Sequence, residues 1–238
     1  MDTLDRLPAA LHAVAPWADA SVWTDALTPS MHSCGLTTPR RAAMFLGQFT
    51  EECGFRVFRE NLNYSADGLR SEWPHLFAPA KGKPGAESYA HQPERIANYV
   101  YSSVCHPYLG NGDEASGDGW LCRGVGGLQL TGRYEISRFA TAVGMTLEAA
   151  IEWMQTPPGA ARSSCWYWLD RGHLLEMSDA WDIEAVTVRI NGGKTNLPLR
   201  ISLCNKALAA FGDDLPEPHT EPTADELNAA WLAAHPAA

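Results

Sequence analysis

The chain has no run of 18 apolar residues, although 45% of its 238 residues are hydrophobic. A membrane-spanning helix needs about 20 consecutive apolar residues, so we expect no membrane insertion. The amino terminus also lacks a basic segment followed by an apolar one, which is the pattern of a secretion signal. We therefore expect synthesis in the cytoplasm without a signal peptide, and export, where it is needed, by another route.

Positive charge is scarce as well. Lys and Arg total 18 against 28 Asp and Glu, which gives a formal net charge of −10. Binding to nucleic acid needs a concentrated basic face, so we expect no nucleic acid as a main partner, although a local basic groove is compatible with this composition.

Cysteine is sparse and irregularly spaced, and no two cysteines form a Cys-x-x-Cys pair. This pattern speaks against a metal cluster, and we expect neither a metal nor a cofactor. Two states of the thiols stay open. Either all are free and buried, or Cys105 and Cys122 form a disulfide that closes the glycine-rich loop. The six cysteines are Cys34, Cys53, Cys105, Cys122, Cys165 and Cys204.

Alternation of period two is absent, whereas helical spacing is widespread, so we expect a mostly α domain. The expected helices span 41–53, 93–104 with Ile96, Val100 and Val104 toward the core, 146–156, 160–170, 182–192 and 198–211. Two long loops, one rich in proline and glycine before residue 93 and one at about 107–127, are typical of functional segments. We expect one catalytic domain over 1–212, then an acidic, proline-rich linker and a short amphipathic tail over 213–238.

Two adjacent carboxylates end the first expected helix. Glu52 follows Phe49 by three residues, at the edge of the buried stripe, where partial desolvation would favour the protonated form that a general acid needs. Glu51 lies about 100° away around the helix, nearer the polar side with Gln48 and Met44. A second carboxylate is needed to activate water, and Glu60 is the best candidate, with Glu72 and Asp67 in reserve.

Three segments carry a resemblance to a known family. They are FLGQFTEECGF at 45–55 with ENLNYS at 60–65, CRGVGGLQLTGR at 122–133, and INGG at 190–193. In this order and spacing they resemble glycoside hydrolase family 19, especially its endolysin-like members. The family pattern for the first segment is Phe-Leu-Ala-Gln, two residues, then His-Glu-Ser-Gly-Gly-Phe, so this chain is one residue short and lacks the histidine. Counting from Gln48 places the family acid at Glu52, and counting back from Phe55 places it at Glu51; we prefer Glu52, because a turn tolerates a deletion better than a packed helix.

The resemblance implies a lysozyme-like, two-lobed helical fold with a substrate cleft. It also implies that Thr131 holds the attacking water. Two departures, Val125 in place of an arginine and Glu135 in place of an asparagine, suggest altered sugar contacts. The residues expected to bind substrate are Asn61, Asn63, Tyr64, Ser65, Arg123, Gln129, Tyr134, Asn191 and Arg200.

From these residues we expect a monomeric enzyme that cleaves β-1,4 bonds between the N-acetylhexosamines of peptidoglycan by an inverting acid/base mechanism. It would act in the periplasm or cell wall after release. The alternatives are a chitinase acting on chitin, a secreted toxin with the same chemistry, and a glycan-binding module made inactive by the deletion and the missing histidine.

Overall fold

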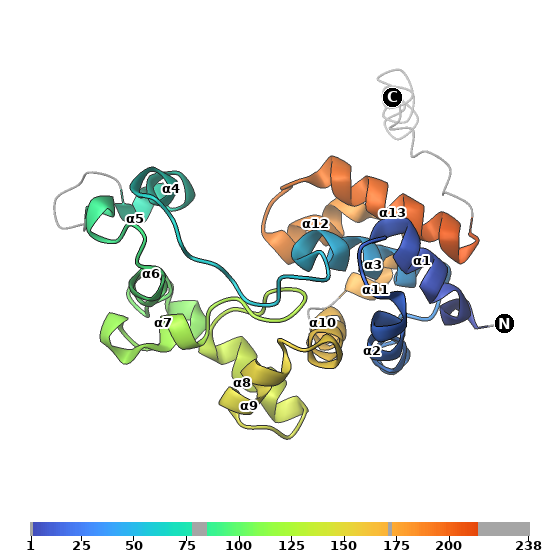
Figure 1. The fold of residues 1–238 in the computed structure, drawn as a ribbon, viewed down its shortest axis with the longest axis horizontal. Helices are drawn as coiled ribbons and strands as arrows, with labels where there is room; N and C mark the ends of the chain where they lie inside the picture. Colours follow the sequence, from blue (N-terminus) through green and yellow to red (C-terminus); the bar gives the residue numbers. More distant parts are fainter. Residues whose placement is uncertain (1, 78–84, 171–172, 214–238) are drawn as a thin grey trace, which may run out of the picture.

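The computed structural model describes residues 2–77, 85–170 and 173–213, and within these ranges the fold is helical (Figure 1). The α-helices are α1 (Leu7–Val14), α2 (Ala20–Ser33), α3 (Pro39–Cys53), α4 (Ala66–Glu72), α5 (Pro74–Phe77), α6 (Pro93–Val100), α7 (Asp118–Leu121), α8 (Arg133–Ala142), α9 (Leu147–Trp153), α10 (Pro157–Asp170), α11 (Leu174–Asp179), α12 (Ile183–Asn191) and α13 (Leu197–Phe211). Four short 3₁₀ turns, Thr3–Arg6, Ala86–Ser88, Pro107–Leu109 and Glu114–Ser116, complete the described elements.

The predicted mostly α class is confirmed. Within the described ranges, β-structure is limited to two isolated bridges, which join Val125 to Arg59 and to Leu130. They tie the extended segment after α3 to the glycine-rich loop after α7, so these two segments lie side by side.

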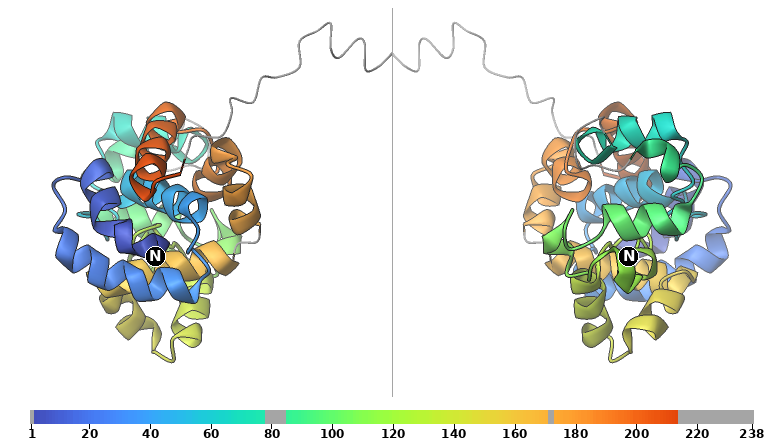
Figure 2. Two further views of the ribbon diagram at one scale, coloured as in Figure 1. Left: turned by 90° about the vertical axis from the view of Figure 1, so that its right-hand side faces the viewer. Right: turned by 90° about the vertical axis from the view of Figure 1, so that its left-hand side faces the viewer.

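The helices pack around three hydrophobic clusters. The largest contains buried side chains of α1, α2, α3, α10, α12 and α13, and α3 lies at its centre. Helix α13 runs along α3 and beside α1 (Figures 1 and 2), and the contact is close enough that a Cβ on Gly47 would lie 2.4 Å from the sulfur of Cys204. The second cluster joins α4, α5 and α6, and the third joins α8 and α9 to the glycine-rich loop. Figure 1 shows the second group of helices well apart from α3 and α13.

Helix α3 is buried on more than one side. Thr38 caps its first turn, and it ends at Gly54, whose φ of 54° is left-handed. Phe45 and Phe49 are buried as expected, but Gln48 and Met44 are also fully buried, so the prediction that these two lie on the polar side is wrong. The reason is that α12 and α13 cover the face that a one-sided amphipathic helix would leave to solvent.

The other expected helices are found with shifted ends. Thr146 caps α9 and Asp182 caps α12, as the sequence predicted. Helix α10 begins at Pro157 rather than at residue 160, because proline fits the first turn of a helix. Helix α6 ends at Val100, and Val104 is therefore 83% exposed instead of facing the core.

All six cysteines carry free thiols, so the Cys105–Cys122 disulfide is not formed. Burial raises the pKa of the Cys122 thiol to about 11. No described helix is long and apolar enough to span a membrane. The predicted amphipathic tail over residues 227–234, like part of the proline-rich segment before residue 85, lies outside the described residues.

Candidate functional site

Glu52 lies in the last turn of α3 and is bound by an arginine from α13. Its Oε1 accepts a hydrogen bond from Nη2 of Arg200 at 2.7 Å, and the Glu52 side chain is only 14% exposed. Arg200 is 2% exposed, and its other nitrogens donate to Oε1 of Gln48 at 2.6 Å and to the carbonyl of Thr195 at 3.1 Å. Arg200 was predicted to bind substrate, but its guanidinium is turned inward and committed to these three acceptors.

The network extends one residue further into the core. Nε2 of Gln48 donates to the hydroxyl of Thr187 at 3.0 Å, and that hydroxyl donates to the carbonyl of Ile183 at 2.7 Å. Glu52 is thus largely buried, as predicted, but its surroundings are polar and charged rather than apolar. The apolar spacing along α3 could not reveal this, because Arg200 is 148 residues away in the chain.

Glu51 points in another direction. Its Oε1 accepts a hydrogen bond from Nδ2 of Asn196 at 2.7 Å, in the loop before α13. Adjacent residues of a helix diverge by about 100°, so the two carboxylates meet different partners. Asn191, expected to bind substrate, is exposed at the end of α12, and Gly192 in the left-handed conformation terminates that helix.

Glu60 lies in the extended segment after α3 and is fixed by the glycine-rich loop. Its backbone N–H donates to the carbonyl of Gly124 at 2.9 Å, and the Gly124 N–H donates back to Oε2 of Glu60 at 3.0 Å. The second carboxylate oxygen, Oε1, accepts from the hydroxyl of Tyr101 at 2.6 Å. Nε of Arg123 donates to the Glu60 carbonyl at 3.2 Å, so both the backbone and the side chain are held.

The loop also touches α3. A Cβ on Gly127 would lie 2.1 Å from Cε2 of Phe49, so the loop backbone presses directly on that ring. At Gly124 a Cβ would lie 2.8 Å from Oε1 of Gln129 and 3.3 Å from Oε2 of Glu60. Glycine is therefore required at Gly127, and the same loop contacts both the helix that carries Glu52 and the segment that carries Glu60.

Gln129 and Thr131 lie within this loop. Gln129 has a φ of 49°, and its Nε2 donates to the carbonyl of Gly126 at 2.9 Å. The Thr131 hydroxyl donates to the Gln129 carbonyl at 2.9 Å. Val125 is fully buried and bridges to Leu130, so the position where the family has an arginine is apolar here.

The polar residues after Glu60 serve mainly local structure. Oδ1 of Asn61 accepts from the N–H of Asn63 at 3.0 Å, and Oδ1 of Asn63 lies 3.1 Å from Nδ1 of His91. The Ser65 hydroxyl caps α4, and the Tyr64 ring packs edge-on against Trp73.

The reserve carboxylates lie farther along the same segment. Asp67 is exposed and pairs with Arg70 at 2.9 Å, so it is engaged in α4 itself. Glu72 is exposed at the end of α4, and its charge contributes to raising the pKa of Tyr64, whose main cause is burial. Glu60 is the candidate that contacts the glycine-rich loop.

Tyr134, expected to face substrate, is 55% exposed on α8.

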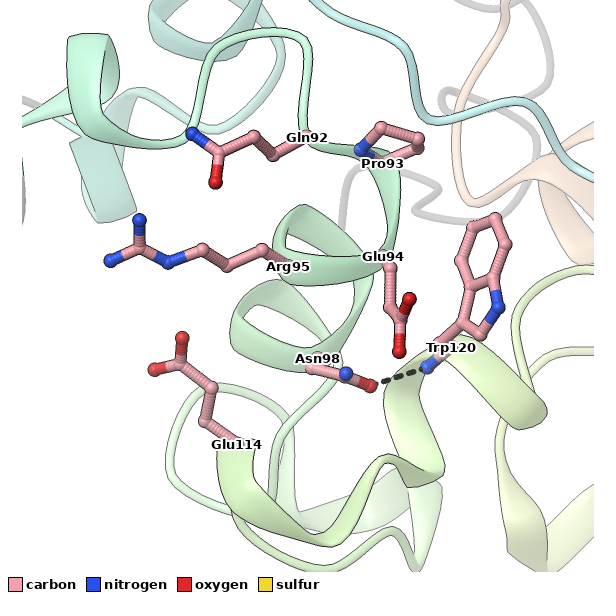
Figure 3. A pocket seen from close by; sticks show the side chains of 7 residues that line it. All are labelled: Gln92, Pro93, Glu94, Arg95, Asn98, Glu114 and Trp120. Atoms are coloured by element: carbon pink, nitrogen blue, oxygen red, sulfur yellow. Dashed lines mark hydrogen bonds between the residues drawn. The ribbon is translucent and has the colours of Figure 1, made fainter.

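A pocket of about 540 Å³ lies beside α6, next to the loop that holds Glu60 (Figure 3). It is lined by Gln92, Pro93, Glu94, Arg95, Asn98, Glu114 and Trp120. Trp120 links this pocket to the site, because the guanidinium of Arg123 lies 3.4 Å from the centre of its ring. Within the described residues, no group of three His, Cys, Asp or Glu side chains is placed to hold a metal ion.

The fold is that of known helical glycosidases. Chitinase C from Streptomyces griseus is similar with a TM-score of 0.55 and 17% identity, over 88% of this chain and 94% of that one. A family 19 class IV chitinase from Zea mays is similar with a TM-score of 0.50 and 15% identity, over 86% of this chain and 87% of that one. The predicted lysozyme-like helical fold is confirmed.

The particular family follows from a closer relative in sequence. A glycosyl hydrolase family 19 domain-containing protein of Haemophilus influenzae is 33% identical over 189 residues, which are 79% of this chain and 88% of that protein. No protein-family profile matches the sequence. The chain belongs to glycoside hydrolase family 19.

Proposed function

We propose that the protein hydrolyses β-1,4 bonds between the N-acetylhexosamines of peptidoglycan by an inverting single displacement. Glu52 is the general acid, Glu60 the general base, and Thr131 helps to hold the attacking water. The observation that carries this proposal is the glycine-rich loop, which presses on Phe49 of α3 and hydrogen-bonds Glu60. This loop contacts both the helix that ends near Glu52 and the segment that carries Glu60, which supports a shared site.

The two carboxylates have different partners. Both oxygens of Glu60 accept a hydrogen bond from a neighbouring group, so this carboxylate is held in one orientation. Glu52 uses only Oε1 for Arg200, and its Oε2 makes no hydrogen bond with a described residue. Oε2 is therefore the atom that would carry the proton to the leaving oxygen.

The polymer is chosen on sequence grounds. The segment 60–65 resembles endolysin-like members of the family, which favours peptidoglycan and an action at the cell wall after release. The similar solved structures are chitinases, and this favours chitin as the alternative. Both polymers present β-1,4-linked N-acetylhexosamines, so the same acid and base serve either substrate.

The test compares wild type with Glu51→Gln, Glu52→Gln and Glu60→Gln. Glu148→Gln on α9, which is not a candidate site residue, is the control for the same change of side chain elsewhere in the protein. Turbidity loss of permeabilised Gram-negative cells and release of reducing ends from chitin oligosaccharides are measured in parallel. We expect cell clearing by wild type, Glu51→Gln and Glu148→Gln and none by the other two. The first product should be the α-anomer, because inversion of a β-bond gives α.

Other outcomes select among the alternatives. Activity on chitin oligosaccharides without cell clearing would support the chitinase. Binding of oligosaccharide without turnover of either polymer would support the inactive glycan-binding module and overturn the proposal.

A further inference from the structure

We propose that Tyr101 is a positioning residue for Glu60. The Tyr101 hydroxyl orients the Glu60 carboxylate and favours the ionised form of that carboxylate. This inference rests on the proposed role of Glu60 as the base. Tyr101 lies directly after α6, outside every segment that carries the family resemblance, so the sequence motifs did not identify it.

The contact has the geometry of a strong hydrogen bond. The Tyr101 hydroxyl lies 2.6 Å from Oε1 of Glu60, within the range of about 2.5–2.7 Å for an O–H donor on a charged oxygen. Oε2 of the same carboxylate is bound by the N–H of Gly124 at 3.0 Å. Two donors from different segments leave the carboxylate little freedom to rotate. Each oxygen keeps a second lone pair for water.

Tyr101 stays a donor at every working pH. Burial, followed by the neighbouring Glu60 charge, holds the pKa of Tyr101 well above its usual range. The phenol therefore cannot act as an acid or base itself near neutral pH. Its chemistry is limited to donating one hydrogen bond, which is what a positioning role requires.

The backbone of Tyr101 is held in place by its neighbours. The Tyr101 N–H donates to the carbonyl of Ala97 at 3.0 Å, and its carbonyl accepts from Nδ2 of Asn111 at 2.8 Å. Asn111 is 6% exposed, and its Oδ1 accepts from the N–H of Arg133 at the start of α8. Helix α6, the following loop and the start of α8 thus jointly fix the backbone position from which the Tyr101 side chain reaches Glu60.

Other charged and titratable groups also face Glu60. Arg123 and Arg59 have pKa values lowered chiefly by burial, to about 10 for Arg59, and Glu60 acts on both in the opposite direction. The charges of Glu72 and Glu60 both contribute to raising the pKa of Tyr64, after burial as the main cause. Removing only the Tyr101 hydroxyl leaves all of these in place, so a changed pH response would report the lost hydrogen bond.

The test is Tyr101→Phe, with Tyr99→Phe as the matched control. The Tyr99 hydroxyl lies 3.5 Å from the Leu76 carbonyl and does not contact Glu60. We expect kcat of Tyr101→Phe to fall by about 10- to 100-fold with KM within about twofold, as for loss of a hydrogen bond to a charged group. The acidic limb of its kcat/KM profile should move to higher pH. Tyr99→Phe should match wild type, and 3-fluorotyrosine at position 101, which keeps the donor, should restore kcat.

The outcomes separate this inference from the function on which it rests. If Glu60→Gln is inactive but Tyr101→Phe keeps the wild-type kcat, the inference is wrong and the base assignment stands. A fall in kcat without movement of the acidic limb would reduce Tyr101 to a structural role and would also overturn it. If Glu60→Gln is as active as wild type, the base assignment itself is wrong, and the role of Tyr101 is wrong with it.

Discussion

Replacing Arg200 by methionine should destabilise the protein strongly, whatever it does to catalysis. Arg200 is 2% exposed and binds the carboxylate of Glu52, which is 14% exposed, and the amide of Gln48. Methionine keeps the apolar stem but removes the cation, so a largely buried carboxylate loses its partner. Breaking one side of such a pair costs about 3–5 kcal/mol. For a domain of this size that lowers Tm by about 6–20 °C.

The measurement is urea unfolding followed by circular dichroism, with Lys206→Met as the control on the same helix. Lys206 is exposed, and a surface change of this kind should alter the free energy of unfolding by no more than about 0.5 kcal/mol. The double variant Arg200→Met/Glu52→Gln should regain part of the loss, because no unpaired charge then remains buried. If Arg200→Met unfolds at the same urea concentration as Lys206→Met, the buried network contributes nothing and the reasoning is wrong.

Two further predictions concern the loop and its surroundings. Gly127→Ala should lower the free energy of unfolding by about 1–3 kcal/mol, because its Cβ would lie 2.1 Å from the Phe49 ring. Gly193→Ala should be neutral in the same urea assay, because its Cβ would meet only Oδ1 of Asn191, at an ordinary contact distance of 4.0 Å. Arg133 holds the pKa of Asp118 below its usual range, so this carboxyl contributes stability above about pH 4 that is lost as pH falls through its lowered value. Acidification should therefore destabilise wild type more than Asp118→Asn in unfolding curves at pH 6 and pH 3; equal losses would contradict this assignment.

The sequence predicted helices best where apolar spacing was dense and the caps were ordinary. Helix α3 and helix α12 follow that rule, and α12 runs from its Asp182 cap to its glycine stop as expected. Helices α1 and α2 were not predicted. Pro29 lies inside α2, where proline is normally a breaker, and packing against α10 compensates for it.

Local sequence patterns could not predict the polar contacts of the candidate site. Apolar periodicity predicts a single buried face for α3. This helix lies at the centre of the largest hydrophobic cluster, however, so Gln48 is also buried and accepts a hydrogen bond from Arg200. The contact between Tyr101 and Glu60 joins residues 41 positions apart with no motif around the tyrosine. The motifs suggested Glu52 and Glu60 as the candidate carboxylates, whereas only the tertiary structure shows which groups hold them.

The position of the missing residue can be argued from the end of α3. The helix continues without interruption to Cys53, and the Gly54 N–H still donates to the Thr50 carbonyl at 2.9 Å. Two successive left-handed residues then follow, Gly54 with φ of 54° and Phe55 with φ of 60°, and the chain reverses there.

The helix is therefore regular through Glu52, and the chain reverses directly after it. Gln48 and Glu52, four residues apart, lie on the same face of α3, and the guanidinium of Arg200 binds both of them. Glu51 lies off this face and meets Asn196 instead. This shared face with Gln48 is the structural reason for keeping Glu52, on the count from Gln48, as the preferred candidate for the acid.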